Sequence, residues 1–184
     1  MQVDRLKFEG ILLISPRVFK DQRGFFVETY QQERYRQAGI DCAFVQDNHS
    51  RSAARTLRGL HFQSSPGQAK LIRVGEGRIF DVVVDIRPDS PTFGQWDGVY
   101  LDSERHQQIF IPIGFAHGFC VISEMADVIY KVSAPYDPAT ECSIAYDDPT
   151  LGVEWPVSDP ILSARDQKAE SFLEYARRLG RKLG

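Results

Sequence analysis

Short apolar runs, separated by turn-forming residues, dominate the middle of the chain. Between residues 42 and 146 they are AFVQDN, LRGLHFQ, KLIRVGEG, RIFDVVVDIR, WDGVYL, QQIFIP, GFCVIS, DVIYKVS and CSIAYD. Gly, Pro, Asp and Ser interrupt the runs at a spacing of roughly ten residues, which is typical of consecutive antiparallel strands. The pattern predicts an antiparallel sandwich or barrel.

The N-terminal part has its own pattern. Residues 10–14 (GILLI) and 25–29 (FFVET) are predicted strands around a turn at 21–24 (DQRG). Residues 30–38 (YQQERYRQA) suit a short helix, with Gly39 as its stop.

The C-terminal segment 163–183 changes to helical periodicity. Its apolar residues at helical spacing are Ala169, Phe172, Leu173, Ala176 and Leu179. Ser163 and Asp166 stand three residues apart, as in a capping box. We expect an amphipathic helix that closes the domain.

Length and composition indicate one globular domain over residues 1–184. The chain is 42% hydrophobic and 26% charged, and no internal repeat or low-complexity linker divides it. Its net charge of -3 argues against a nucleic-acid partner, which usually requires a basic face. It leaves room for a small anionic ligand held by a few arginines.

Cysteine usage and the apolar runs predict a cytoplasmic protein. Cys42, Cys120 and Cys142 form no CxxC pair, so they predict reduced thiols rather than a disulfide framework. The start, MQVDRLKFEG, has no apolar region typical of a signal peptide. No run approaches the ~20 apolar residues of a membrane span, so we expect no membrane partner.

The run TLRGLHFQ, residues 56–63, carries the first candidate chemistry. Arg58, His61 and Gln63 are set among apolar residues on a predicted strand. His61 could be a base, because imidazole exchanges protons near neutral pH. It could equally be a packed histidine with its hydrogen bonds satisfied. The residues alone leave both interpretations open.

Seven segments in order resemble a known family. They are RGFFVET, FVQDNHSRS, TLRGLHFQ, KLIRVGEGRIFDVVVDIR, IPIGFAHGF, DVIYKVSAPYDP and LSARD, and the similarity extends over roughly residues 5–166. The chain resembles the dTDP-4-dehydrorhamnose 3,5-epimerases, which are cupin-type nucleotide-sugar enzymes. The resemblance implies a mainly β fold, namely a jelly-roll antiparallel sandwich with a short N-terminal and a C-terminal helix. It also implies a homodimer with exchanged N-terminal strands, and no metal or other cofactor.

The resemblance implies a reaction by proton transfer at carbon. The substrate would be dTDP-4-keto-6-deoxy-D-glucose, whose C4 ketone acidifies the C–H bonds at C3 and C5. His61 would be the base and Tyr130 the acid on the opposite face, with Lys70 stabilising the enolate. Asp166 would orient His61, although its position also suits a helix cap.

The resemblance also implies a set of substrate-binding residues: Arg23, Glu28, Gln46, Asp47, Asn48, Arg58, Lys70, His117, Glu141 and Arg165. Arg23 would reach the nucleotide from the partner subunit. The run Gln46–Asn48 could read sugar and base edges, or could form a turn. Arg165 departs from the lysine that is commoner in the family, which keeps the charge and changes the contact geometry.

Three alternatives differ from this hypothesis in activity. A metal-dependent cupin would need a second histidine beside His61, where the sequence reads His-Phe-Gln. A non-catalytic binder of nucleotide sugars would not need both His61 and Tyr130. An enzyme that epimerises only C3 or only C5, in a modified deoxysugar pathway, could use the same base and acid.

Overall fold

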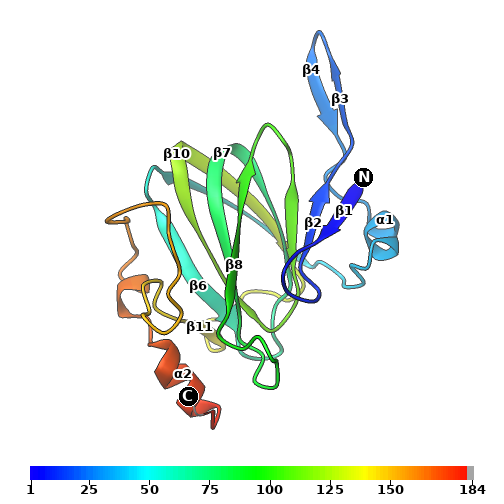
Figure 1. The fold of residues 1–184 in the computed structure, drawn as a ribbon. Helices are drawn as coiled ribbons and strands as arrows, with labels where there is room; N and C mark the ends of the chain where they lie inside the picture. The colour runs from blue at the N-terminus through cyan, green and yellow to red at the C-terminus, as the bar shows by residue number, and fades with distance from the viewer. Residues whose placement is uncertain (182–184) are drawn as a thin grey trace.

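The computed structural model describes residues 1–181 as a mainly antiparallel β structure with two short α-helices (Figure 1). The strands are β1 (Gln2–Arg5), β2 (Leu12–Ser15), β3 (Val18–Asp21), β4 (Gly24–Val27), β5 (Gln46–Ala53), β6 (Leu57–Gln63), β7 (Lys70–Asp85), β8 (Trp96–Asp102), β9 (Gln108–Ile111), β10 (Phe115–Val132) and β11 (Glu141–Ser143). The helices are α1 (Gln32–Gln37) and α2 (Phe172–Arg178), and a 3-10 turn, η1, spans Asp166–Lys168. The predicted strand run and N-terminal helix are confirmed.

Two long strands, β7 and β10, connect the two layers of the sandwich. Each contains two runs that the sequence pattern separates, and they pair with each other along most of their length. The pairing register shifts between Val121 and Ala126, where both strands bend. Gly77 lies at this bend with a φ of +78°, and a Cβ there would lie 2.0 Å from the carbonyl oxygen of Met125. Only glycine fits this bend.

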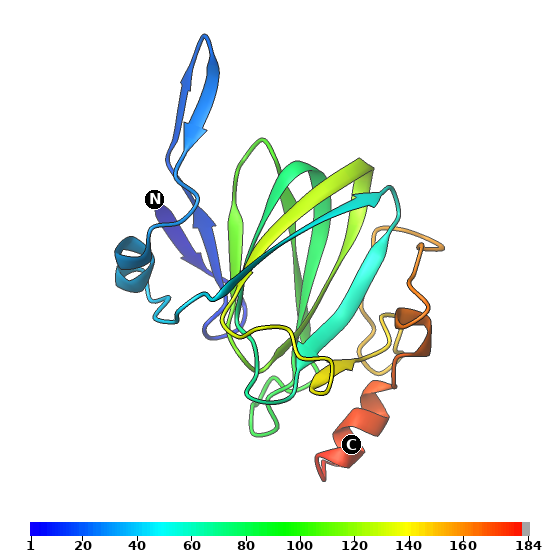
Figure 2. The same cartoon turned by 180° about the vertical axis from the view of Figure 1, so that it is seen from behind.

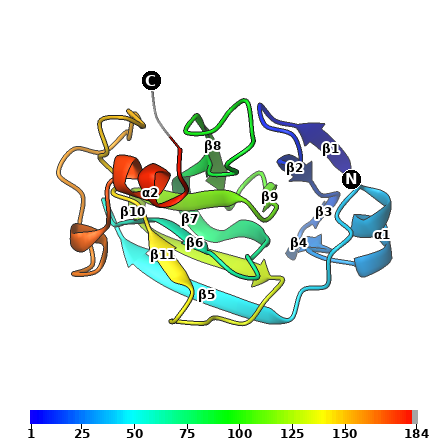
Figure 3. The ribbon, with the colours of Figure 1, turned by 90° about the horizontal axis from the view of Figure 1, so that it is seen from below.

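The bend divides the strand pairs into two facing layers. The first half of β7 and the second half of β10 pair with β9 and β5, and β2 and β1 extend this layer. The other halves pair with β8 and β6, and β11 extends that layer. Figure 3 shows the two layers from below. This is the jelly-roll sandwich that the sequence predicts.

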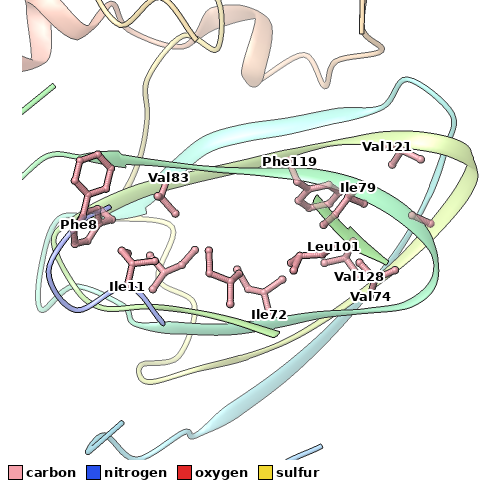
Figure 4. Close-up of a cluster of buried hydrophobic side chains, with 14 residues drawn as sticks. Phe8, Ile11, Ile72, Val74, Ile79, Val83, Leu101, Phe119, Val121 and Val128 are labelled. Atoms are coloured by element: carbon pink, nitrogen blue, oxygen red, sulfur yellow. The ribbon is translucent and has the colours of Figure 1, made fainter. Parts of the chain in front are cut away.

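The main core fills the space between the layers (Figure 4). Its buried residues are Phe8, Ile11, Ile72, Val74, Ile79, Val83, Leu101, Ile109, Ile111, Phe115, Phe119, Val121, Ala126 and Val128. A second apolar cluster lies on the outer face of the β6 layer, where Phe172 and Tyr175 of α2 cover it. Some side chains of β6, β7 and β10 belong to neither apolar cluster, and polar residues occupy these positions.

The N-terminal strands pair differently from the prediction. The turn at 21–24 joins β3 to β4, while β2, which contains most of the run 10–14, pairs with β1 and β9. The β3–β4 hairpin projects away from the sandwich (Figures 1 and 2). Phe19, Phe25 and Phe26 on this hairpin are 49%, 59% and 67% exposed.

The C-terminal helix begins later than predicted. Its capping box is Ser171 with Glu174, and the helix α2 starts at Phe172. Ser163 still accepts a hydrogen bond from the backbone N–H of Asp166, at 3.1 Å, but this bond lies at the start of the short turn η1 and not at the start of the helix. The predicted helix residues 182 and 183 lie outside the described residues. Within residues 1–181, none of the helices has the length and apolar character needed to cross a membrane.

Candidate active site

Strands β6 and β10 approach each other closely at a pair of glycines. Gly59 has a φ of +148°, and a Cβ built on it would lie 2.5 Å from the Cα of Gly118. A side chain at Gly59 would therefore push the strands apart. On the same ladder His61 is the Cα partner of His117. The neighbours of His61, Leu60 and Phe62, pack into the outer cluster, so the imidazole faces the space between the layers.

His61 is hydrogen-bonded to the carboxylate of Asp166. The distance from His61 Nε2 to Asp166 Oδ1 is 2.6 Å, although the two residues are far apart in the sequence. The Asp166 side chain is 2% exposed and that of His61 is 19% exposed. Burial alone would raise the pKa of Asp166, but hydrogen bonds from His61 and Ser163 hold it below its usual value. The carboxylate thus stays charged and fixes the imidazole.

Arg165 lies against the same imidazole. Its Nη2 is 2.9 Å from His61 Nε2 and 3.4 Å from Nδ1. Nε2 has no free lone pair for Arg165, because it carries the hydrogen that it donates to Asp166. Nδ1 is therefore the nitrogen that can accept a proton. Arg165 also pairs with Glu141, so the sequence-predicted residues Arg165 and Glu141 both belong to this cluster.

Lys70 lies beneath His61 and is only partly exposed. Its Nζ is 3.4 Å from the carbonyl oxygen of His61, a long hydrogen bond. Burial lowers the pKa of Lys70 to about 8, and the nearby carboxylates of Asp81 and Glu141 oppose this shift. The lysine is therefore a cation near neutral pH with few fixed partners.

A second histidine–carboxylate pair lies deeper between the layers. His117 Nε2 is 2.9 Å from Asp81 Oδ2, and the two side chains are 10% and 0% exposed. Burial lowers the pKa of His117 despite the opposing charge of Asp81, so its imidazole is neutral at neutral pH. Sequence reasoning found His117 but missed Asp81. The available signal was an aspartate within the apolar run IFDVVV, because a buried charge needs a partner.

Tyr130 reaches the same space from the other layer. It packs against the main core and is a Cα partner of Asn48 on β5. Burial raises its pKa, and Arg58, Glu141 and Arg165 are the charged groups close enough to affect it. The phenol therefore holds its proton at neutral pH and can act only as a donor. The structure thus brings His61 and Tyr130 into one polar cluster from two different layers.

The predicted segment Gln46–Asn48 is a strand rather than a turn. Gln46 donates to Asn48 at 2.8 Å and accepts a bond from the backbone N–H of Tyr136 at 3.1 Å. Asp47 alternates to the other face of β5, where it pairs with Lys131. Gln46 and Asn48 thus share a face with the Tyr130 side of the site, and Asp47 points away from it.

Of the remaining predicted residues, one lies at the site and two lie away from it. Arg58 donates to the buried Ser52 at 3.1 Å and lies near Tyr130. Arg23 binds Asp21 at the tip of the β3–β4 hairpin, and Glu28 binds Arg34 near α1. Within one chain, Arg23 and Glu28 therefore lie outside the polar cluster.

Two further polar contacts in the cluster escaped sequence reasoning. Tyr136 donates to Glu141 at 2.9 Å, and Gln63 bonds to Thr140 at 3.1 Å. The strand pair β6–β11 brings Gln63 to Thr140, a contact that local pattern cannot reveal. Among the described residues, no three His, Cys, Asp or Glu side chains gather in a way that could hold a metal ion.

This geometry is set up to move protons to and from carbon. A carboxylate-held imidazole can remove a weakly acidic proton only if the resulting negative charge is stabilised, and Lys70 supplies positive charge close by. Tyr130 offers a proton from the facing layer. The molecule is thus a cupin-type jelly-roll enzyme with a histidine–carboxylate pair, a tyrosine and a lysine between its layers.

Comparisons with known proteins give the particular family. Residues 5–174 match the dTDP-4-dehydrorhamnose 3,5-epimerase family. The dTDP-4-dehydrorhamnose 3,5-epimerase of Pseudomonas aeruginosa is 48% identical over 95% of this chain and 97% of its own. The Legionella pneumophila RmlC epimerase, solved with dTDP-4-keto-L-rhamnose, has a TM-score of 0.93 and 45% identity over 100% of this chain and 98% of its own. A Streptomyces niveus dTDP-4-dehydrorhamnose 3-epimerase is 42% identical over 92% of this chain and 83% of its own.

The chain belongs to the dTDP-4-dehydrorhamnose 3,5-epimerase family. Its activity is the epimerisation of dTDP-4-keto-6-deoxy-D-glucose at C3 and C5 to dTDP-4-keto-L-rhamnose, in dTDP-L-rhamnose biosynthesis. The recognition from seven sequence segments is confirmed.

Proposed function

We propose that His61 is the base and Tyr130 the acid of this epimerisation. His61 Nδ1 takes the proton from C3 or C5, and the electron pair of the C–H bond moves to the C4 oxygen. Lys70 stabilises the resulting enolate. Tyr130 then gives its proton to the opposite face of the carbon, and the C4 carbonyl forms again. The hydrogen bond between His61 and Asp166, at 2.6 Å with a partly exposed imidazole, carries this proposal.

Proton exchange followed by NMR tests these roles. The substrate dTDP-4-keto-6-deoxy-D-glucose is incubated with the protein in D2O, and the proton signals at C3 and C5 are followed with time. The unaltered protein should lose both signals. Tyr130→Phe should still exchange protons through His61 but form little inverted product, because the acid is missing. Persistence of both signals with the unaltered protein would contradict the reaction, and full product formation by Tyr130→Phe would remove Tyr130 from its role.

We further propose that Gln46, Asn48, Arg58, Glu141 and Arg165 bind the nucleotide sugar. Support comes from their convergence on the face that carries Tyr130 and His61. Arg58 and Arg165 suit phosphate oxygens, because a guanidinium presents a planar set of donors. Asp47, on the other face, would act only by holding Lys131 and β5 in place.

We infer that the protein works as a homodimer in which the β3–β4 hairpin crosses to the partner subunit. An isolated hairpin with three exposed phenylalanines is marginal in water, and such apolar exposure is typical of an interface. The crossing would take Arg23 and Glu28 to the partner's site. Light scattering tests the assembly. A mass near 20.9 kDa would contradict it, and Phe26→Asp should convert dimer to monomer.

We also infer a cytoplasmic enzyme. Support comes from the described cysteines Cys42, Cys120 and Cys142, which are all free thiols. Fractionation of cells followed by immunodetection tests the location, and recovery in an oxidising compartment would contradict it.

A further inference from the structure

The buried pair His117–Asp81 has no role in the proton transfers described above. Asp81 lies on β7 and faces inward, and one of its oxygens, Oδ2, accepts a hydrogen bond from His117 Nε2. The other oxygen, Oδ1, is fully buried and is bonded to none of the described residues. A half-satisfied carboxylate between two layers of a core is costly unless a positive charge lies within reach.

Lys70 is the cation next to this pair, because its ammonium lies against the backbone of His61, whose strand partner is His117. Asp81 is the strongest electrostatic influence that keeps the Lys70 ammonium charged against its burial, ahead of Glu141. Arg165 acts in the opposite direction. His117 and His61 are the remaining titratable groups close to Lys70, from β10 and β6. The ammonium itself makes only a long bond to a backbone oxygen, so its charge depends on these neighbours.

The neutral state of His117 decides what the pair contributes. An imidazolium would cancel the charge of Asp81, and the neutral pair would then have little electrostatic effect on Lys70. Burial lowers the pKa of His117, so the pair retains one negative charge at neutral pH. His117 then acts as a neutral donor that orients the carboxylate without neutralising it.

We propose that Asp81 is a positioning residue for the epimerisation, because its carboxylate, oriented by His117, keeps the Lys70 side chain charged and available to the enolate. This inference rests on the proposed role of Lys70. Asp81 touches no reacting atom and acts only through the lysine. The role gives a reason for keeping a buried carboxylate whose Oδ1 has no hydrogen-bond partner among the described residues.

The pH dependence of kcat/KM separates this role from a purely structural one. The unaltered enzyme should lose activity on the alkaline side near pH 8, where Lys70 loses its proton. Asp81→Asn keeps the shape and the hydrogen bond from His117 but removes the charge. Removing a negative neighbour favours the neutral lysine, so the pH at which kcat/KM falls on the alkaline side should be about one pH unit lower. The loss of kcat/KM should then be about tenfold at pH 8.5 and under about twofold at pH 6.

Two variants provide the controls. Asp127→Asn removes another buried carboxylate, which pairs with Arg51, and should leave the alkaline limb in place. Lys70→Arg carries a cation that does not titrate in this range, so its alkaline limb should vanish. Adding Asp81→Asn to Lys70→Arg should then produce no pH-dependent loss.

The outcomes are distinguishable. If Lys70→Arg keeps the limb near pH 8, the proposed role of Lys70 is wrong. If Lys70→Arg removes the limb but Asp81→Asn loses activity equally at all pH values, or none, only the inference about Asp81 is overturned. Should Asp81→Asn fail to fold, carboxyl carbon NMR of unaltered protein decides. The Asp81 resonance should shift at the pH where Lys70 titrates, and a flat resonance there overturns the inference.

Discussion

The two histidine–aspartate pairs of this enzyme have the same chemistry and different surroundings. In the first, His61 on β6 meets Asp166 from the turn η1, and the imidazole is 19% exposed. In the second, His117 and Asp81 lie on adjacent strands, β10 and β7, and both are buried. Exposure gives His61 a nitrogen that can meet substrate and exchange its proton with water. Burial keeps His117 neutral and leaves Asp81 as a fixed charge. We therefore expect the two environments to give the same pair of residue types different roles in the proposed mechanism.

The largest expected effect comes from removing the exposed imidazole. His61→Asn should lower kcat by about 10³-fold or more, because a positioned base contributes about 10²–10⁴. The dissociation constant for dTDP, measured by calorimetry, should change by less than about threefold. His49→Asn is the matched control, because His49 is an exposed histidine on β5. A His61→Asn variant that keeps a tenth of wild-type kcat would show that another group is the base.

The next effect comes from the carboxylate of the first pair. Asp166→Asn should lower kcat by about 10²-fold or more, because the imidazole loses its orientation and the charge that supports its protonation. The loss should be similar at pH 6 and pH 8.5. For Asp81→Asn, by contrast, the loss of kcat/KM should grow with pH. This difference between the two variants is the sharpest test of the comparison between the two histidine–aspartate pairs. Equal pH dependence for the two variants would mean that both carboxylates act in the same way.

A smaller effect should follow from the turn that holds Asp166. Ser163→Ala removes the acceptor of the Asp166 backbone N–H, and capping bonds of this kind contribute about 1 kcal/mol to stability. Urea unfolding should show a free energy of unfolding lower by about this amount. The value of kcat should fall about threefold, because the Asp166 carboxylate is held less firmly. The matched control is Ser171→Ala, which weakens the cap of α2 instead. Its stability loss should be similar, with kcat unchanged.

The smallest effect is on the pH dependence of stability. The folded state lowers the pKa of Asp166 below 3.8. The ionised group therefore stabilises the fold above pH 3.8, and this contribution is lost as the pH falls through the lower, folded-state value. The difference in unfolding free energy between unaltered protein and Asp166→Asn should narrow between pH 5 and pH 2.5. A difference that stays constant over this range would show that the charge of Asp166 is not coupled to folding.

Local pattern was sufficient for most of the strands but not for their pairing. The spacing of turn residues predicted the β-rich middle, and Gly39 ends the N-terminal helix region as expected. The pattern divided β7 and β10 into separate runs, β7 because Gly75 and Gly77 resemble turn signals and β10 because the polar Ser123 and Glu124 interrupt it. In the structure the strands bend there and continue pairing. Whether a glycine ends a strand or bends it depends on the neighbouring strand, which local sequence does not describe.

The C-terminal segment also shows that local sequence does not determine which distant residue a side chain contacts. Asp166 looked like a helix cap, and the resemblance pointed to a partner of His61. The structure gives a short turn in which the backbone of Asp166 is capped by Ser163 and its side chain binds His61. Both interpretations contained part of the answer, because a carboxylate can point away from the turn that its backbone forms.

The sequence by itself determined the family, the β-rich class and most of the candidate site residues, because ordered motifs and residue spacing are properties of the chain. Tertiary structure alone decided which of those residues meet. It joined His61 to Asp166, turned Asp47 away from the site and paired Asp81 with His117. The physical reason is that burial and pairing across distant strands set charge, proton position and partner, and these quantities depend on the fold rather than on neighbours in the chain.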